Sequence, residues 1–168
     1  MNMDKKTLHL DETDHSIVYA LANNSRMSSR DVAKHVGVSH QTVLSRIKTL
    51  EDEGIISKYG AFVNWFKLGF PVVTMTLIET GKFDEKSFKF VGDYIRAEKS
   101  FVSASQLDGT YDMYIIGVFR NQEQAKEKIS KFRSFLSENL DVKSFKNHSV
   151  WDVIKHTHAS PLESDEKK

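Results

Sequence analysis

The feature that most constrains the fold is a pair of closely spaced helix signals between Ser28 and Gly54. Ser28 is a favoured N-cap residue, Asp31 follows three positions later, and Gly37 can adopt the positive φ at which many helices end. Ser39 offers a second N-cap shortly after this glycine. Two helices joined by a short turn form a helix-turn-helix, so the spacing predicts this motif.

The second of these helices has one apolar stripe. Val43, Ile47 and Leu50 stand at i, i+4 and i+7, so we expect them to face the interior. The opposite face has no acidic residue before positions 51–53, as expected of a helix that approaches phosphates. The residues expected to look outward are Gln41, Ser45 and Lys48, with Leu44 beside them.

Charge is unevenly distributed along the chain. The formal net charge is only +1, which argues against a surface that attracts polyanions everywhere. Residues 26–50 nevertheless hold a surplus of basic residues over the single acid Asp31. The basic residues are Arg26, Arg30, Lys34, Arg46 and Lys48. This surplus indicates either a basic patch or an ordinary solvated surface, and charge alone does not decide between them.

The chain divides into two small domains. An apolar stripe after Asp11 predicts a helix over about residues 12–22, so residues 1–60 are expected to form a three-helix domain. Residues 61–70 are expected to form a linker strand. From Pro71 to residue 155 the patterns follow the order βαββαβ, which folds as a four-stranded antiparallel sheet with both helices on one face. This predicts an α+β protein with a ferredoxin-like second domain, followed by a disordered polar tail at residues 156–168.

A helix-turn-helix places its second helix in the major groove of DNA, while phosphate contacts hold its register. The residues expected to read base edges are His40, Gln41, Leu44, Ser45 and Lys48, and Ser39 and Thr42 are expected to belong to the same DNA-binding surface. The residues expected to contact phosphates are Arg30, Lys34 and Arg46. Arg46 lies at the border of the apolar stripe, so an ion pair with Asp14 or Glu51 is the alternative for it. A bundle of three helices can also be a plain interaction module.

Three stretches of the chain resemble a known family. They are LDETDHSIVYAL, RMSSRDVAKHVGVSHQTVLSRIKTLEDEGIISKY and LDGTYDMYIIGV. From about Leu10 to Ile154 the chain is similar to the leucine-responsive and asparagine regulator family (Lrp/AsnC) of bacterial and archaeal transcription factors. The resemblance implies a winged or extended helix-turn-helix, followed by a ferredoxin-like effector domain that forms a homodimer and often assembles further, to a tetramer or octamer.

The dimer has a physical counterpart in the sequence. FVSASQL and YDMYIIGVF place apolar residues on both faces of the expected sheet, and only one face is covered by the helices. Pairing two sheets face to face would bury the other face. A dimer would also present two recognition helices to two half-sites on DNA.

The resemblance implies a small-molecule site as well, because family members commonly bind an amino acid between subunits near the turn between the second and third strands. The matching residues are Leu107, Asp108, Gly109, Thr110, Tyr111 and Asp112. Backbone amides around Gly109 and a carboxylate would meet the two charges of an amino acid. The alternative is that Asp108 and Gly109 simply form the hairpin turn and that Asp112 caps the local backbone.

Catalysis is the competing class of function, since relatives of this architecture include decarboxylases of haem precursors. A cationic pocket for such a substrate would use His148 and His156 with Arg120, Lys143 or Lys146, although solvated charge is the usual explanation for such residues. His156 and His158 without a third ligand are a poor metal signal. We therefore expect no catalytic residue, metal or cofactor. The chain has no cysteine, no signal peptide pattern and no long apolar run, so we expect a cytoplasmic protein.

Overall fold

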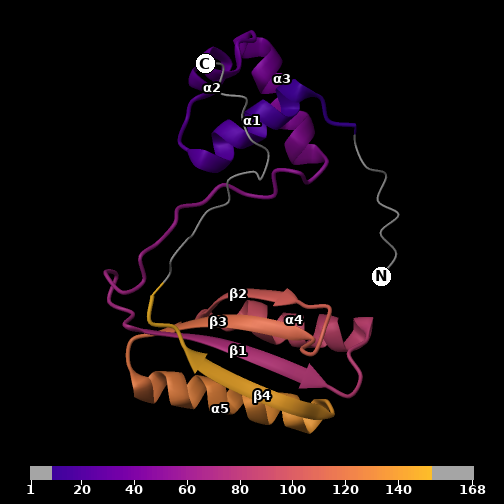
Figure 1. The fold of residues 1–168 in the computed structure, drawn as a ribbon, viewed down its shortest axis with the longest axis vertical. Coiled ribbons are helices and arrows are strands. Elements are labelled where there is room, and N and C mark those ends of the chain that lie inside the picture. The colour runs from indigo at the N-terminus through magenta and orange to yellow at the C-terminus, as the bar shows by residue number, and fades with distance from the viewer. Residues whose placement is uncertain (1–8, 153–168) are drawn as a thin grey trace. The chain divides into compact units, whose positions relative to one another are not determined.

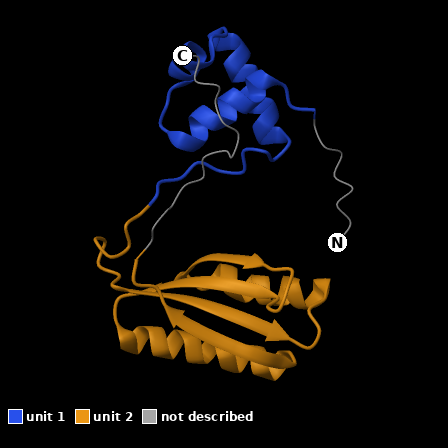
Figure 2. Ribbon diagram, viewed as in Figure 1, with its two compact units in different colours: residues 1–62, 155–168 blue, residues 63–154 orange. Residues whose placement is uncertain are grey.

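The structure, a computed structural model, describes residues 9–152 of the 168 and divides into two compact units between Phe62 and Val63 (Figure 2). The predicted tail at residues 156–168 and the pair His156 and His158 lie outside the described residues. The N-terminal unit contains α1 (Glu12–Asn23), α2 (Ser29–Val36) and α3 (His40–Asp52) (Figure 1). The C-terminal unit contains β1 (Val72–Thr80), α4 (Glu85–Ala97), β2 (Phe101–Gln106), β3 (Met113–Phe119), α5 (Gln122–Asn139) and β4 (Val142–Ser149).

Local capping fixes the three N-terminal helices where the sequence predicted them. Asp11 and Asp14 form a capping box at the start of α1. The hydroxyl of Ser28 accepts from the backbone N–H of Asp31, and Gly37 ends α2 with a φ of 80°. Because α3 begins at His40, the helix-turn-helix prediction is confirmed. The buried side chains between the helices are Ile17, Ala20, Leu21, Val32, Ala33, Val43 and Leu50.

The segment between α3 and β1 corrects one expectation. Residues 61–70 contain no strand; they form an irregular stretch and a turn, in which the N–H of Phe70 donates to the carbonyl of Trp65. A strand exists only when its backbone pairs with another strand, and no described strand pairs with this segment. Before it, the Tyr59 hydroxyl donates to Glu51 over 2.8 Å, and burial together with this carboxylate raises the pKa of Tyr59 to about 12. Tyr59 therefore remains a donor at neutral pH and anchors the chain to the end of α3.

The C-terminal unit is the predicted four-stranded antiparallel sheet, with strand order β2-β3-β1-β4 (Figure 1). Alternate strand residues point to the same side of the sheet. One of the two faces packs against α4 and α5. The core on that face consists of Ile78, Val91, Met113, Ile115, Phe132 and Leu136, with a smaller cluster of Val72, Phe119 and Ala125. The ferredoxin-like arrangement is confirmed.

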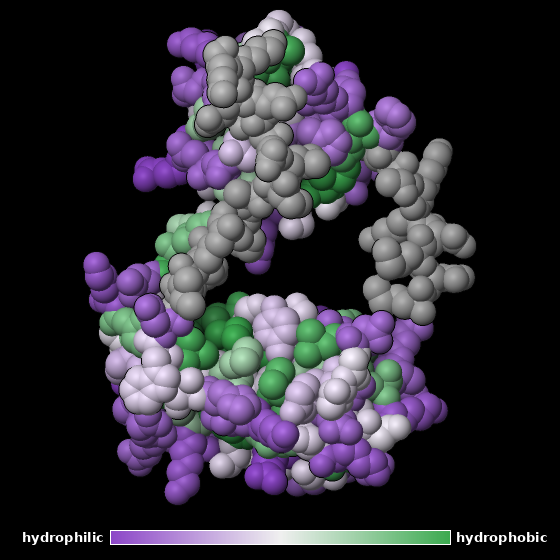
Figure 3. Space-filling view, viewed as in Figure 1, coloured by the Kyte–Doolittle hydropathy of each residue, from purple (hydrophilic) through white to green (hydrophobic). Residues whose placement is uncertain are grey.

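The other face of the sheet is also apolar along its two central strands. Met75 pairs with Ile116 and Leu77 pairs with Tyr114, and all four alternate with residues of the helix-covered core. Each of these side chains is half-buried. Figure 3 shows hydrophobic residues exposed among hydrophilic ones on this unit. The expected apolar alternation on both faces is present, and no described helix covers the second face.

Candidate functional site

The orientation of α3 agrees with the prediction from its apolar stripe. Val43 and Leu50 are 0% and 1% exposed, so the inward face is fixed by packing. The opposite face is open, and its Leu44 is 43% exposed although it is apolar. The outward side chains are Gln41, Leu44, Ser45 and Lys48. This face offers hydrogen-bonding groups, one apolar side chain and one cation, and no carboxylate lies within its first three turns.

Three residues at the start of α3 have partners inside the unit. The hydroxyl of Ser39 accepts from the N–H of Thr42 over 3.0 Å and lies 2.7 Å from its hydroxyl oxygen. Nε2 of His40 lies 2.8 Å from Oγ of Ser29, which joins α3 to α2. These contacts hold the N-terminal turn of α3 in place. No sequence signal pointed to the contact of Ser29 with His40, because it depends on how the two helices cross.

Arg46 turns toward α1 rather than outward. Its guanidinium lies 2.9 Å from Asp11 and 3.0 Å from Asp14, whose side chain is only 6% exposed. Of the two roles that the sequence left open, the described geometry is that of the intradomain ion pair, with Asp14 as partner and not Glu51. Arg46 sits in the border of the stripe, one position before Ile47, where its side chain reaches α1.

Two basic residues of α2 remain open to solvent. Arg30 and Lys34 stand one helical turn apart and are both exposed. Neither forms an ion pair with any residue between 9 and 152, and the same holds for Lys48 on α3. The basic surplus of residues 26–50 therefore includes three cations whose charge no acid of the described chain neutralises by direct contact.

The loop between β2 and β3 is a closed hairpin. The N–H of Leu107 donates to the carbonyl of Asp112 over 2.8 Å. The Asp112 carboxylate accepts from both the N–H and the hydroxyl of Thr80, over 2.6 and 3.0 Å. Asp112 thus caps the end of β1 at Thr80, and not the local backbone of the hairpin as the alternative had expected. The residues Leu107, Asp108, Gly109 and Thr110 are exposed at the tip.

Beside this hairpin, Lys146 of β4 lies over the ring of Tyr111, with Nζ 5.7 Å from the ring centroid. A hydrogen bond with Tyr111 raises the pKa of Lys146. The carboxylate of Asp108 has no partner among residues 9–152, in contrast to that of Asp112. Of the two carboxylates in the predicted effector segment, only Asp108 is uncommitted.

Comparison with known proteins agrees with this geometry. A model for winged helix-turn-helix DNA-binding domains matches residues 10–57. The HTH-type transcriptional regulator Ptr1 of Methanocaldococcus jannaschii is 32% identical over 116 residues, which cover 68% of this chain and 75% of that protein. An uncharacterized HTH-type transcriptional regulator of Pyrococcus furiosus is 28% identical over 148 residues, covering 88% of this chain and 95% of the relative.

Solved structures extend the likeness over both units. LrpC of B. subtilis is 25% identical with a TM-score of 0.69, covering 87% of this chain and 97% of that one. A transcriptional regulator from Neisseria meningitidis, solved in complex with L-Met, is 25% identical with a TM-score of 0.74, covering 91% of this chain and 97% of the other. The chain belongs to the Lrp/AsnC family of transcriptional regulators.

Several of the residues named for a decarboxylase have other partners in this Lrp/AsnC regulator. Lys143 pairs with Asp141 over 2.8 Å, and Lys146 lies over the ring of Tyr111. Arg120 lies over the ring of Phe70, 5.8 Å from its centroid. Between residues 9 and 152 no three His, Asp or Glu side chains are grouped to hold a metal ion. Within the same range no helix has the length and apolar character needed to cross a bilayer.

Proposed function

We propose that this regulator recognises specific sequences in duplex DNA by placing the outward face of α3 in the major groove. The observation that supports this proposal is the composition of that face. Its exposed side chains can bond base edges or phosphates, and its first three turns carry no carboxylate that phosphates would repel. A regulator that acts on chromosomal DNA in a bacterium or archaeon works in the cytoplasm.

Each outward residue has a distinct proposed role. Gln41 can bond adenine bidentately, its side-chain oxygen accepting from N6 and its NH₂ donating to N7, and Leu44 can contact the methyl group of thymine. Lys48 and the two exposed cations of α2, Arg30 and Lys34, contact phosphates and add salt-sensitive affinity. Ser45 is small enough to let the helix approach the groove closely.

The remaining predicted contacts have supporting roles in this proposal. Ser39 and Thr42 cap α3, and His40 ties it to Ser29 of α2. Arg46 fixes the angle of α3 against α1 through Asp14. These four residues lie near DNA but act mainly by positioning the residues that touch it.

We further propose that the protein forms a homodimer through the uncovered sheet face, and that dimers assemble to a tetramer or octamer. The apolar side chains of β1 and β3 on that face, among them Met75 and Ile116, would be buried by a second copy of the sheet. The dimer presents two copies of α3, which address two half-sites of a palindromic operator.

The hairpin of residues 107–112 is the proposed site for an amino-acid effector. The Neisseria meningitidis relative was solved as an L-Met complex, which supports this ligand class. Because Asp112 already accepts two hydrogen bonds from Thr80, Asp108 is the carboxylate available for the ammonium group. The backbone amides around Gly109, where φ is 150°, are available for the carboxylate.

Selection from a pool of random duplexes, at one stated salt concentration, tests the proposal. The purified full chain should enrich one palindromic sequence. A pool that stays random while the protein binds it would contradict sequence-specific recognition. Repeating the selection with L-Met and with other amino acids tests the effector, because an effector must change the affinity for the enriched sequence.

A further inference from the structure

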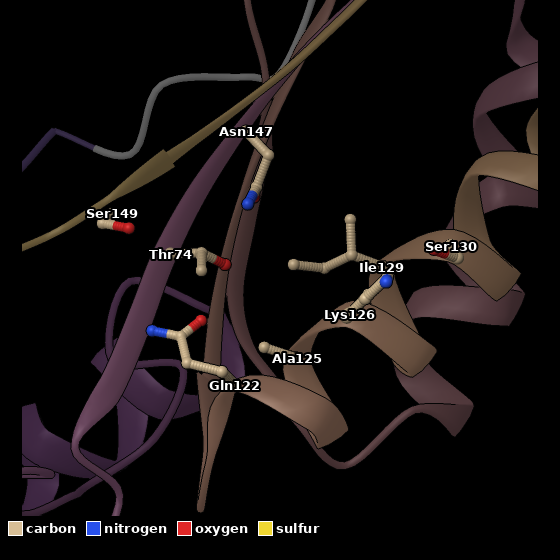
Figure 4. A pocket seen from close by; sticks show the side chains of 8 residues that line it. All are labelled: Thr74, Gln122, Ala125, Lys126, Ile129, Ser130, Asn147 and Ser149. Atoms are coloured by element: carbon tan, nitrogen blue, oxygen red, sulfur yellow. The ribbon is translucent and has the colours of Figure 1, made fainter.

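A pocket in the C-terminal unit lies between the N-terminal half of α5 and the strands β1 and β4 (Figure 4). Its volume is about 270 Å³, room for roughly nine water molecules. Figure 4 shows side chains from the strands and from the helix arranged around the same space. The lining residues that matter here are Thr74, Asn147 and Ser149 on the strands, and Gln122, Lys126 and Ile129 on the helix.

The pocket exists because the helix-covered layer changes composition along its length. On β1 the side chains facing the helices change from Ile78 to Thr76 and Thr74, and on β4 they change from Phe145 to Asn147. On α5 the bulky core residues likewise lie toward the C-terminal end, and small or polar ones lie here. The side chains of β1, β4 and α5 that face one another here are thus mostly small or polar. The space between them is not filled by the core.

Thr74 shows that this region is more than a solvated rim. The residue is only 4% exposed, and its hydroxyl, which forms no hydrogen bond with another residue of the range 9–152, lines the pocket. Figure 4 shows this oxygen directed toward α5, into the pocket. A hydroxyl on a residue this buried, open only to the pocket and without a protein partner, is available to a polar atom of a bound molecule.

Asn147 supplies a second directed group. Its Oδ1 accepts from the hydroxyl of Thr76 over 2.8 Å, so the orientation of the amide is fixed. The NH₂ group is left to donate, and in Figure 4 the nitrogen lies on the pocket side, above Thr74. Two adjacent strands therefore aim hydrogen-bonding groups at one point.

The charge of the lining indicates the class of ligand. No Asp or Glu lines the pocket, and Lys126 forms no ion pair with any residue of the described range. The pocket also lies along the first turns of α5, a helix of 18 residues whose N-terminal end favours negative charge. Donors and positive potential together select an anion, and the volume restricts it to a small one.

We propose that this pocket binds a small carboxylate, with its carboxylate at Lys126 and Asn147 and a second polar group at Thr74. The site is separate from the hairpin of residues 107–112. Thr74 lies six residues along β1 from Thr80, which contacts that hairpin, a separation of roughly 20 Å. The inference concerns the C-terminal unit alone and does not depend on DNA binding.

Titration of the isotope-labelled full chain, followed by NMR, tests this site. The probes are lactate, malate and an N-acetylated dipeptide, which presents a carboxylate at the end of a chain; lactamide is the uncharged match for lactate. We expect at least one carboxylate probe to shift the amide signals of Thr74, Asn147 and Ser149, and lactamide to shift them far less. Binding of lactate or malate but not of the dipeptide would identify a free metabolite as the ligand, and binding of the dipeptide alone would identify a peptide C-terminus. Either result supports the site.

Variants connect the binding to the named groups. Lys126→Gln should lower the affinity for the carboxylate probe at least about tenfold. Lys89→Gln changes an exposed lysine of α4 and should leave that affinity unchanged. Thr74→Val should lower the affinity for the carboxylate probe by about 2- to 10-fold, whereas Thr74→Ser, which keeps the hydroxyl, should keep the wild-type affinity. The proposal is overturned if no carboxylate probe shifts the pocket signals at millimolar concentration, if lactamide binds as well as lactate, or if the shifts appear only at residues 107–112.

Discussion

Arg46 of α3 lies 3.0 Å from Asp14 of α1, and it is the carboxylate that is buried while the guanidinium remains partly open. Asp14 also accepts from the backbone N–H of Asp11 in the capping box. One arginine therefore connects the recognition helix to the start of the first helix. The ion pair therefore contributes to the packing of α3 against α1.

Arg46→Ala should destabilise the protein without removing a phosphate contact, because the guanidinium is engaged with Asp11 and Asp14. Removing the guanidinium leaves Asp14 buried without its cation, so we expect the free energy of unfolding to fall by about 1–3 kcal/mol. Urea denaturation measures this loss. At temperatures where the variant is folded, the dependence of log K on log salt should keep the wild-type slope. A slope lowered by about one would show instead that Arg46 contacts a phosphate.

Lys48→Ala and Arg30→Ala should weaken binding to specific and random duplexes alike. If each residue meets one phosphate, each variant should lower the salt slope by about one. Lys89→Ala removes an equally exposed lysine from α4 in the other unit and is the matched control. Fluorescence anisotropy over a range of salt concentrations gives all the slopes. A residue whose variant keeps the wild-type slope is not a phosphate contact.

Gln41→Ala should alter specificity rather than general affinity. Loss of a bidentate contact costs about 1–3 kcal/mol at the base concerned, so one or two positions of the enriched site should become degenerate. Repeating the selection with the variant measures this directly. Equal weakening on every sequence, with no change in preference, would make Gln41 a backbone contact.

Ile116→Asp should dissociate the proposed dimer, because it places a charge at the centre of the uncovered sheet face. Phe88→Asp makes the same change on α4, on the helix-covered side of the sheet, and should leave the assembly intact. Sedimentation velocity gives the oligomeric state, and circular dichroism checks the fold of each variant. If Phe88→Asp dissociates the protein and Ile116→Asp does not, the dimer interface lies on the helices and not on the uncovered sheet face.

Asp84 gives the stability of the C-terminal unit a specific pH dependence. The backbone N–H of Ser87, followed by its hydroxyl, lowers the pKa of Asp84 from 3.8 to about 2. A carboxyl whose folded pKa is depressed adds stability that is fully present above its unfolded value of 3.8 and is lost as the pH falls toward about 2.

Asp84→Asn keeps a capping oxygen at the start of α4 but has no proton to bind. Its unfolding free energy should therefore fall less steeply than that of the wild type in this pH range. Urea denaturation at a series of pH values gives both curves. Parallel curves would show that the cap contributes nothing to acid sensitivity.

Features set by neighbours in the chain were predictable. The caps at Ser28, Gly37 and Ser39 act over three residues, so the sequence alone located the helix-turn-helix. The apolar stripe that includes Val43 and Leu50 follows helical periodicity within one helix, so the sequence also predicted which face of α3 is outward. The order of strands and helices likewise identified the sheet topology.

Features set by contacts between distant elements were not predictable. Arg46 had two candidate acids in the sequence, and only the packing of α1 against α3 selects Asp14. Apolar residues at 61–70 resembled a strand, but no described strand is placed to pair with them. The pocket depends on the register that sets Thr76 opposite Asn147, which no local pattern reveals.

In the proposed function, the outward face of α3 approaches DNA. Ser45→Glu places a carboxylate on that face, where phosphates would repel it, and Ser137→Glu makes the same exposed change on α5. The measurement is the affinity of each variant for the enriched duplex at one salt concentration, with circular dichroism to confirm the fold. Ser45→Glu should bind more than about 100-fold more weakly than wild type, and Ser137→Glu should bind like it. Wild-type affinity of a folded Ser45→Glu variant would show that this face of α3 does not approach DNA.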